Sequence, residues 1–407
     1  MSPTTGRLHR HRTLRERLAV IYEVSGTAER IASMEGLRGL AVLLVFFVHF
    51  HALFRIYVDR ESLSYACSRF LSVTGHSGVD LFFVISGYLI YGAVLDRRIQ
   101  YGRFLRRRVQ RIYPTFLSVL GLYVVLSVLF PWKSKIPSGH LNAVLYVLAN
   151  AALLPGILPI EPMMSVAWTL SYEFFFYLTI PIFVAIWGLR ERSRLARMVF
   201  LSGCTAVFLA SSMLSWVGHS RLALFLIGAL LYDVVRSEGL KARLNRLGEI
   251  CSVLVFVLGM VAIYVVTTQL QLSIPMRSVI RVVILCVSLF GFTLFCVAFN
   301  GLLRRMFCWT PIRWLGNMSY SYYLLHSLTL QAVVLGLSRL ITPEPYPILF
   351  WAMMPVSLSA TLVSSTILFL LVEKPFSLQP PGTRAKLRAE YPEVAGATQG
   401  GTGAHGG

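Results

Sequence analysis

Charged residues are scarce in this sequence of 407 residues. Asp, Glu, Lys and Arg make up 14% of the chain, whereas soluble domains carry about a quarter. Hydrophobic residues make up 56%, and they fall in blocks of roughly 17 to 25, the length that crosses about 30 Å of hydrocarbon. This composition excludes an ordinary soluble domain and predicts a polytopic integral membrane protein.

Other features are missing as well. The apolar blocks lack the period-2 alternation of transmembrane β-strands, so we predict an all-α fold. The six cysteines show no metal-ligand spacing, and we interpret them as small core residues with no metal site. Residues 1–30 are polar and arginine-rich rather than a cleavable signal peptide, so we expect the first helix to target the chain.

The basic balance of the chain, 38 Lys and Arg against 18 Asp and Glu, fits membrane topology better than nucleic-acid binding. Basic residues cluster in the short segments between apolar blocks, as the positive-inside rule requires. If residues 142–160 crossed the membrane, the basic segment 190–194 would lie outside. We therefore predict about ten transmembrane helices in the cell (cytoplasmic) membrane, both termini cytoplasmic, and a re-entrant or interfacial segment at 142–160.

The predicted organisation has three parts. Residues 1–30 form a basic cytoplasmic tail, residues 31–379 form the membrane core, and residues 380–407 form a disordered cytoplasmic tail. The last part is predicted from the run of Ala, Gly and Thr that ends the chain.

Ionisable residues inside apolar blocks are costly and often functional. Arg38 and His49 share the first block, and eleven steps of 1.5 Å place them about 16 Å apart along a helix axis. Arg38 would lie at the cytoplasmic edge and His49 deep in the bilayer. Arg38 could equally be a topology anchor, and His49 a satisfied core histidine.

Arg108 and Arg111 are three residues apart, one helical turn, and can point the same way. Pro114 suits the first turn of the helix that follows. Two guanidiniums aimed from a helix start suit a phosphate group, because arginine offers planar bidentate donors. A simple topology anchor explains the same residues as well.

Glu173 lies in an otherwise uncharged block, where burial would suit it to proton transfer or where it could pair with a neighbouring Arg or His. His326 is a second lone histidine inside a predicted span, and Arg281 also falls within a helix.

At these residues the chain resembles the membrane acyltransferase 3 family. Seven motifs occur in the family's order across about residues 31–378. They are Arg38 with His49; Gly78, Asp80, Ser86 and Gly87; Arg108 and Arg111 before Pro114; Trp168 to Glu173; Arg221, Phe225 and Gly228; Ser319-Tyr320-Ser321 with His326; and Val372 to Phe376. The sequence departs from the family pattern at Phe174-Phe175 and at Ser327-Leu328, which bears on substrate identity more than on reaction type.

The resemblance implies an isolated membrane core that moves an acyl group, expected to be acetyl, from a coenzyme A thioester to a hydroxyl of an envelope or secreted carbohydrate. Acetyl-CoA would be a substrate, with no tightly bound cofactor. The implied roles are donor binding by Arg38, Arg108 and Arg111; catalysis by His49 as base with Glu173 or Asp80 as its partner; and lining of the acyl channel or substrate site by Ser171, Tyr320 and His326.

Two other classes stay open at this stage. A transporter or exporter of a small organic anion or glycan would also place ionisable residues inside helices, but it would not need an arginine cluster facing coenzyme A. A structural membrane subunit would tolerate loss of His49. The expected partners are therefore acyl-CoA, a carbohydrate or glycolipid acceptor, and the bilayer.

Overall fold

The computed structural model describes residues 13, 18–19, 21–23, 32–96, 100–214 and 219–378. The two predicted tails lie almost wholly outside these residues. The described part is helical, and its one β feature is an isolated bridge between Pro155 and Leu158. The predicted all-α fold is confirmed.

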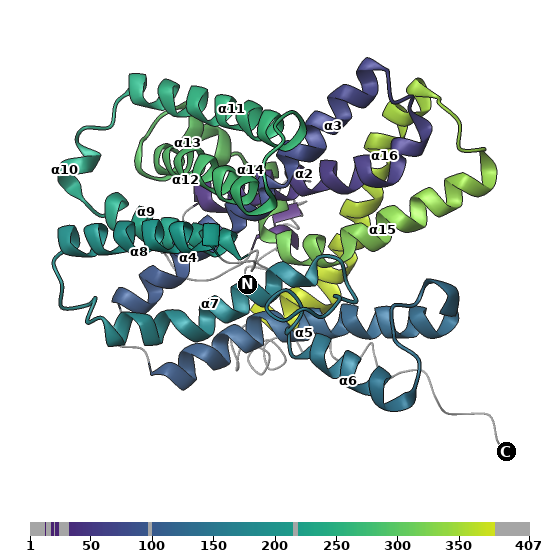
Figure 1. Cartoon of the computed structure of the whole chain (residues 1–407), viewed down its shortest axis with the longest axis horizontal. Helices are drawn as coiled ribbons and strands as arrows, with labels where there is room; N and C mark the ends of the chain where they lie inside the picture. The colour runs from purple at the N-terminus through teal and green to yellow at the C-terminus, as the bar shows by residue number, and fades with distance from the viewer. Residues whose placement is uncertain are drawn as a thin grey trace, which may run out of the picture.

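The helices follow one another through short connections (Figure 1). Their bounds are α2 Ala32–Phe54, α3 Leu63–Gly75, α4 Ser77–Asp96, α5 Tyr101–Leu129, α6 His140–Ala151, α7 Ala167–Ile186, α8 Arg194–Leu214, α9 Ala223–Val235, α10 Glu238–Lys241, α11 Arg246–Thr268, α12 Ile274–Ala298, α13 Leu302–Phe307, α14 Thr310–Asn317, α15 Ser319–Leu340 and α16 Pro347–Leu368. Short 3₁₀ turns at Arg55–Tyr57, Pro131–Lys133 and Ser220–Leu222 and a π-helical segment at Phe369–Leu378 complete them.

Nine segments of the described residues are long and apolar enough to cross a membrane. Helix α9, with 13 residues, is shorter, but it packs parallel to α4. Gly87 of α4 contacts Phe225 and, further along both helices, Gly92 contacts Tyr232. Helix α9 therefore runs in the same direction as α4, and its crossing of the membrane as a tenth span stays a prediction.

Helix α6 holds the segment that was predicted not to cross. Its 12 residues are about 18 Å long, too short for the hydrocarbon layer. In Figure 1, α6 lies at the same end of the bundle as the α15–α16 connection, and α10 lies at the opposite end. The chain turns back after α6 at Gly156, whose φ of 92° and close approach to Trp168 leave no room for a side chain. The prediction for residues 142–160 agrees with this geometry.

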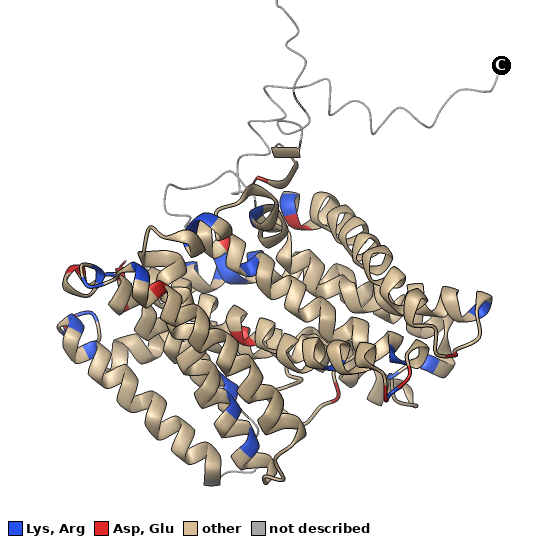
Figure 2. Ribbon diagram, turned by 90° about the horizontal axis from the view of Figure 1, so that it is seen from above, with Lys and Arg blue, Asp and Glu red and all other residues tan. Residues whose placement is uncertain are grey.

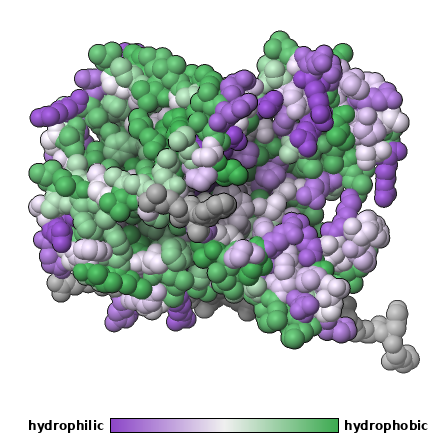
Figure 3. Space-filling model, viewed as in Figure 1, coloured by the Kyte–Doolittle hydropathy of each residue, from purple (hydrophilic) through white to green (hydrophobic). Residues whose placement is uncertain are grey.

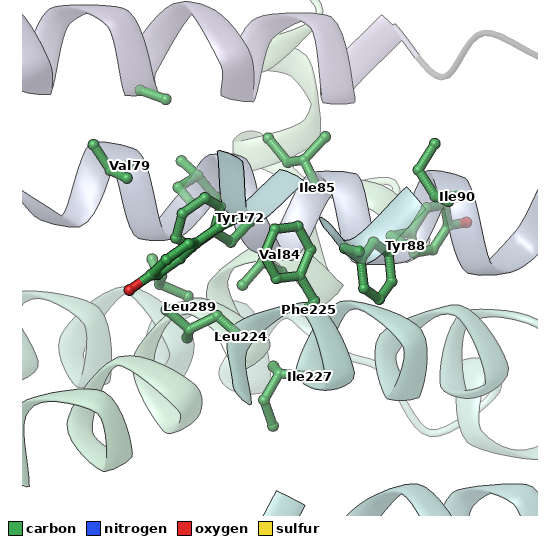
Figure 4. Packing of buried hydrophobic residues seen from close by; sticks show 14 of the residues in the cluster. Val79, Val84, Ile85, Tyr88, Ile90, Tyr172, Leu224, Phe225, Ile227 and Leu289 are labelled. Carbon is green, nitrogen blue, oxygen red and sulfur yellow. The ribbon is translucent and has the colours of Figure 1, made fainter. Parts of the chain in front are cut away.

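Small residues set the distance between α4 and α9. A Cβ on Gly87 would lie 2.2 Å from the Phe225 carbonyl oxygen, and one on Gly228 would lie 2.2 Å from the Val84 oxygen. The backbones therefore touch, as small residues allow in membrane helix pairs. Figure 4 shows the apolar side chains that α4, α7, α9 and α12 contribute around this contact, including Phe225 and Tyr172.

Charged residues lie mainly at helix ends and in connections, with a few inside the bundle (Figure 2). The face drawn in Figure 3 carries broad hydrophobic areas with hydrophilic groups toward its edges. Large exposed apolar side chains such as Val128, Leu254 and Val287 face outward from α5, α11 and α12. Such a surface is stable in lipid rather than in water.

Candidate functional site

Three arginines from two helices form what we call the α2–α5 arginine cluster: Arg38, Arg108 and Arg111. The guanidinium of Arg108 lies 5.3 Å from the ring centroid of Phe104 and 5.5 Å from that of Tyr177. The Nε atoms of Arg38 and Arg108 are buried without a hydrogen-bond partner in the described residues. Two N–H donors of the cluster therefore have unused hydrogen-bonding capacity.

Glu173 belongs to this cluster rather than to a histidine. Its Oε1 accepts hydrogen bonds from the Ser86 hydroxyl at 2.8 Å and from the Tyr177 hydroxyl, one turn further along α7. Arg38 and Arg108 lie within its electrostatic reach. The carboxylate thus offsets part of the positive charge of the arginines, and its hydrogen bonds fix the hydroxyls of Ser86 and Tyr177.

Glu373 is a second carboxylate at the cluster. It is fully buried in the π-helical segment and accepts three hydrogen bonds: 2.8 Å from Nη1 of Arg111, 2.9 Å from the Ser321 amide and 2.6 Å from the Ser321 hydroxyl. Buried carboxylates are stable only with such partners. One guanidinium of the cluster is therefore already neutralised within the protein.

A small cavity of about 50 Å³ opens beside the cluster. Its polar lining comprises Arg38, Ser86, Thr169, Glu173, Ser319, Tyr320 and Tyr323. The Tyr320 hydroxyl donates to the Ile112 carbonyl at 2.9 Å, and the Tyr323 hydroxyl lies 2.6 Å from the Thr169 hydroxyl. Ser171 is not among these lining residues, because its hydroxyl turns back to the Ala167 carbonyl of its own helix.

His49 and His326 meet across α2 and α15. Their ring centroids are 4.7 Å apart and the rings are nearly perpendicular. His326 is fully buried, and its Nδ1 lies 3.0 Å and 2.8 Å from the carbonyl oxygens of Tyr322 and Tyr323. Carbonyls only accept, so this nitrogen carries the proton. The Nε2 of His326 is then an unprotonated acceptor, and it has no partner among the described residues.

Asp80 pairs with Arg221 rather than with His49. It is fully buried, and its Oδ1 is 3.6 Å from the Nε of Arg221. Neither of its oxygens accepts a hydrogen bond from a described residue. His76 lies within electrostatic reach of both Asp80 and His49. The structure therefore joins neither Glu173 nor Asp80 to His49 by a hydrogen bond.

The reading of the sequence missed several groups in this region. It did not single out Glu373 as a site residue, nor Tyr177, Ser86, Ser321 or His76. The spacing of Glu173 and Tyr177, four residues on one helix, was a usable signal. The described residues contain no group of three His, Cys, Asp or Glu that could hold a metal ion.

Comparison with known proteins adds the following. Residues 31–370 match the model of a protein family described as an acyltransferase domain. Protein YrhL of Bacillus subtilis is 24% identical over 86% of this chain and 55% of its own length. Peptidoglycan O-acetyltransferase OatA of Listeria monocytogenes is 26% identical over 85% of this chain and 55% of its own. Exopolysaccharide production protein ExoZ of Rhizobium meliloti is 35% identical over 25% of this chain and 32% of its own.

The chain spans about half the length of the first two of these relatives. No solved structure matches it.

Proposed function

The chain belongs to the acyltransferase family whose model it matches, and from this premise we propose that it is a membrane O-acyltransferase that moves an acetyl group from coenzyme A to a carbohydrate hydroxyl. The predicted family is confirmed, and the chain is a multi-pass membrane enzyme of the acyltransferase class. The names of two relatives, which concern peptidoglycan O-acetylation and exopolysaccharide production, support a carbohydrate acceptor.

The α2–α5 arginine cluster is suited to the phosphates of the donor. Among the described residues, Arg38 and Arg108 each have a buried Nε without a hydrogen-bond partner, while Arg111 is held by Glu373. Guanidinium groups bind phosphate through paired, charge-assisted hydrogen bonds. Arg108 also stacks on aromatic rings, and Arg38 lies within electrostatic reach of Glu173 and Glu373.

The observation that carries the proposal is that the arginine cluster and the histidine pair lie on shared helices, at a separation that the donor can span. The cavity beside Arg38 lies between α2, α4, α7 and α15, and the two helices α2 and α15 also carry His49 and His326. Arg38 and His49 are about 16 Å apart along α2. This separation matches the reach of an extended pantetheine arm, so phosphates held at Arg38 would place the thioester near His49.

His49 then acts as the general base of the proposed reaction. The acceptor hydroxyl gives its proton to the imidazole as its oxygen attacks the thioester carbonyl carbon. The C–S bond breaks, the acetyl ester forms, and the proton passes to the departing thiolate to give free coenzyme A. His326, locked as the neutral tautomer with a free Nε2, is a positioning residue that stabilises His49 when it is protonated.

The two carboxylates predicted to assist His49 take other roles in this proposal. Glu173, bonded to Ser86 and Tyr177, balances the donor-binding arginines. Asp80 pairs with Arg221. The donor would bind at the cytoplasmic side and the acceptor at the outer side, which places both termini in the cytoplasm.

The test uses the purified full-length protein with acetyl-CoA. We expect His49→Ala to lower acetyl transfer by about 10² to 10⁴ while acetyl-CoA affinity is kept, because a general base contributes that much to the rate. His51→Ala is the matched control, since His51 lies on the same helix but bonds to Ser68 at 3.0 Å. Turnover of His49→Ala close to that of the control would move the base to another residue, and His326→Ala would then be decisive.

A further inference from the structure

Three arginines that the proposed reaction does not use line one cavity of about 230 Å³, which we call the α9–α12 arginine pocket. Arg221 lies in the 3₁₀ turn before α9, and Arg277 and Arg281 lie one turn apart near the start of α12. Ser278 completes the polar lining. The pocket therefore lies where α9 and α12 begin, whereas the α2–α5 arginine cluster lies where α2 and α5 begin.

The charges of this pocket are not balanced within the described residues. Arg281 faces Arg221 and Arg277, which repel it, and one carboxylate, Asp80. Within the part of the chain that the structure describes, the one close ion pair of the pocket is that of Arg221 with Asp80, at 3.6 Å. In the same residues, the Nε atoms of Arg277 and Arg281 are buried and have no hydrogen-bond acceptor. The three arginines are only partly buried, but cations crowded around one cavity with a single carboxylate nearby favour a bound anion.

The guanidiniums are nevertheless held in position. Arg221 lies 5.5 Å from the ring centroid of Trp168, and Arg277 donates to the Leu272 carbonyl at 3.2 Å. The hydroxyls of Ser220 and Ser278 lie 2.8 Å apart and tie the turn before α9 to α12. A pocket whose donors are fixed in advance loses little conformational freedom when it binds a ligand.

We propose that the α9–α12 arginine pocket binds an oxyanion of the acyl acceptor, so that the acceptor is an acidic carbohydrate bearing a carboxylate or a phosphate. This inference rests on the proposed function and adds the charge of its substrate. The Arg221–Asp80 pair links the pocket to α4, and Asp80 and His49 both lie within electrostatic reach of His76. An acceptor anchored by its anion would thus present a neighbouring hydroxyl toward His49.

The test measures binding rather than turnover, with glucuronate as the acidic probe, glucose as the neutral one and inorganic phosphate as a free oxyanion. The full chain is purified in neutral detergent, saturated with coenzyme A to occupy the α2–α5 arginine cluster, and unfolded by heat at constant ionic strength. We expect glucuronate and phosphate, but not glucose, to raise the unfolding temperature. Arg277→Gln should weaken the apparent affinity for glucuronate roughly tenfold, because a charge-assisted hydrogen bond is lost.

The controls separate the possible sources of the effect. Arg339→Gln removes an exposed arginine at the end of α15 and should leave glucuronate binding unchanged. Arg277→Lys, which keeps the charge but not the planar fork, should give an intermediate affinity. Stabilisation that depends on Arg277 with phosphatidylglycerol but not with glucuronate would assign the pocket to a lipid headgroup and overturn the proposal, as would equal effects of glucuronate and glucose.

Acetyl-CoA affinity is measured on a portion of each preparation that has received no coenzyme A. If acetyl-CoA fails to bind while the Arg277-dependent effect of glucuronate persists, the proposed function fails and the anion site stands. If acetyl-CoA binds normally and glucuronate has no such effect, the acidic acceptor is excluded and the proposed function stands.

Discussion

The two groups of arginines differ in how many carboxylates accompany them, and this changes the charge that is left to bind a ligand. In the α2–α5 arginine cluster, three guanidiniums share two carboxylates, Glu173 and Glu373, and stack on aromatic rings. In the α9–α12 arginine pocket, three guanidiniums share the single carboxylate of Asp80. The first group has a formal charge of +1, from three cations and two anions, and the second has +2, from three cations and one anion. The second group is the more positive, as suits an anionic ligand.

We place the two groups of arginines on opposite sides of the membrane. Labelling of single cysteines tests this placement, because each cysteine either reacts or does not. Ser193 is an exposed residue in the connection between α7 and α8. With α6 not crossing, a cysteine at Ser193 in a background without the six native cysteines should not react with an impermeant thiol reagent added to intact cells. Ser138→Cys, in the exposed connection before α6, should react.

Labelling of Ser193→Cys from outside would mean that residues 142–160 cross after all. The side of the membrane assigned to each arginine group would then be wrong, and the donor could not bind where we place it.

The next largest effect is expected from the ion pair that neutralises the cluster. Arg111→Ala would leave Glu373 buried and charged without its cation, and we expect a loss of about 3–5 kcal/mol in unfolding free energy. The exposed pair of Arg236 with Asp96, 2.6 Å apart, is the control, and Arg236→Ala should cost less than about 1 kcal/mol. Reversible unfolding in detergent measures both. Equal losses would mean that Glu373 is stabilised mainly by Ser321.

Replacement of Arg108 is expected to change the unfolding free energy less, but to weaken donor binding clearly. This arginine stacks on Phe104 and Tyr177 and makes no ion pair within the 4 Å limit among the described residues. Arg108→Ala should weaken acetyl-CoA binding roughly tenfold through the loss of charge-assisted hydrogen bonds to phosphate. The exposed neighbour Arg107 is the matched control. Unchanged donor affinity in Arg108→Ala would reduce this side chain to a topology anchor.

Much of the fold was predictable because lipid imposes simple rules on a chain. Apolar blocks of spanning length located the long helices, and the basic segment at 190–194 identified residues 142–160 as the segment that does not cross. Helix α9 has only 13 residues, and its length alone does not identify it as a crossing. What the sequence could not reveal is that α9 packs along α4 through Gly87 and Gly228.

The pairings within the site were less predictable because they join distant parts of the chain. Arg111 and Glu373 are 262 positions apart, and nothing local indicates that they meet. Glu173 was expected beside His49, but it bonds to Ser86 and Tyr177 instead. Residue type and helix position identified the chemical groups, whereas the packing of helices decided which groups became partners.

The central claim is that an acetyl group passes through the protein from a donor at the α2–α5 arginine cluster to an acceptor on the other side. The most direct measurement places labelled acetyl-CoA inside sealed vesicles, on the side of the chain termini, and an acidic polysaccharide outside. We predict labelled acetyl ester on the outer polysaccharide with the wild-type protein and about 10² to 10⁴ less with His49→Ala. Ester formation only when donor and acceptor share one side, or equal transfer by His49→Ala, would contradict the account.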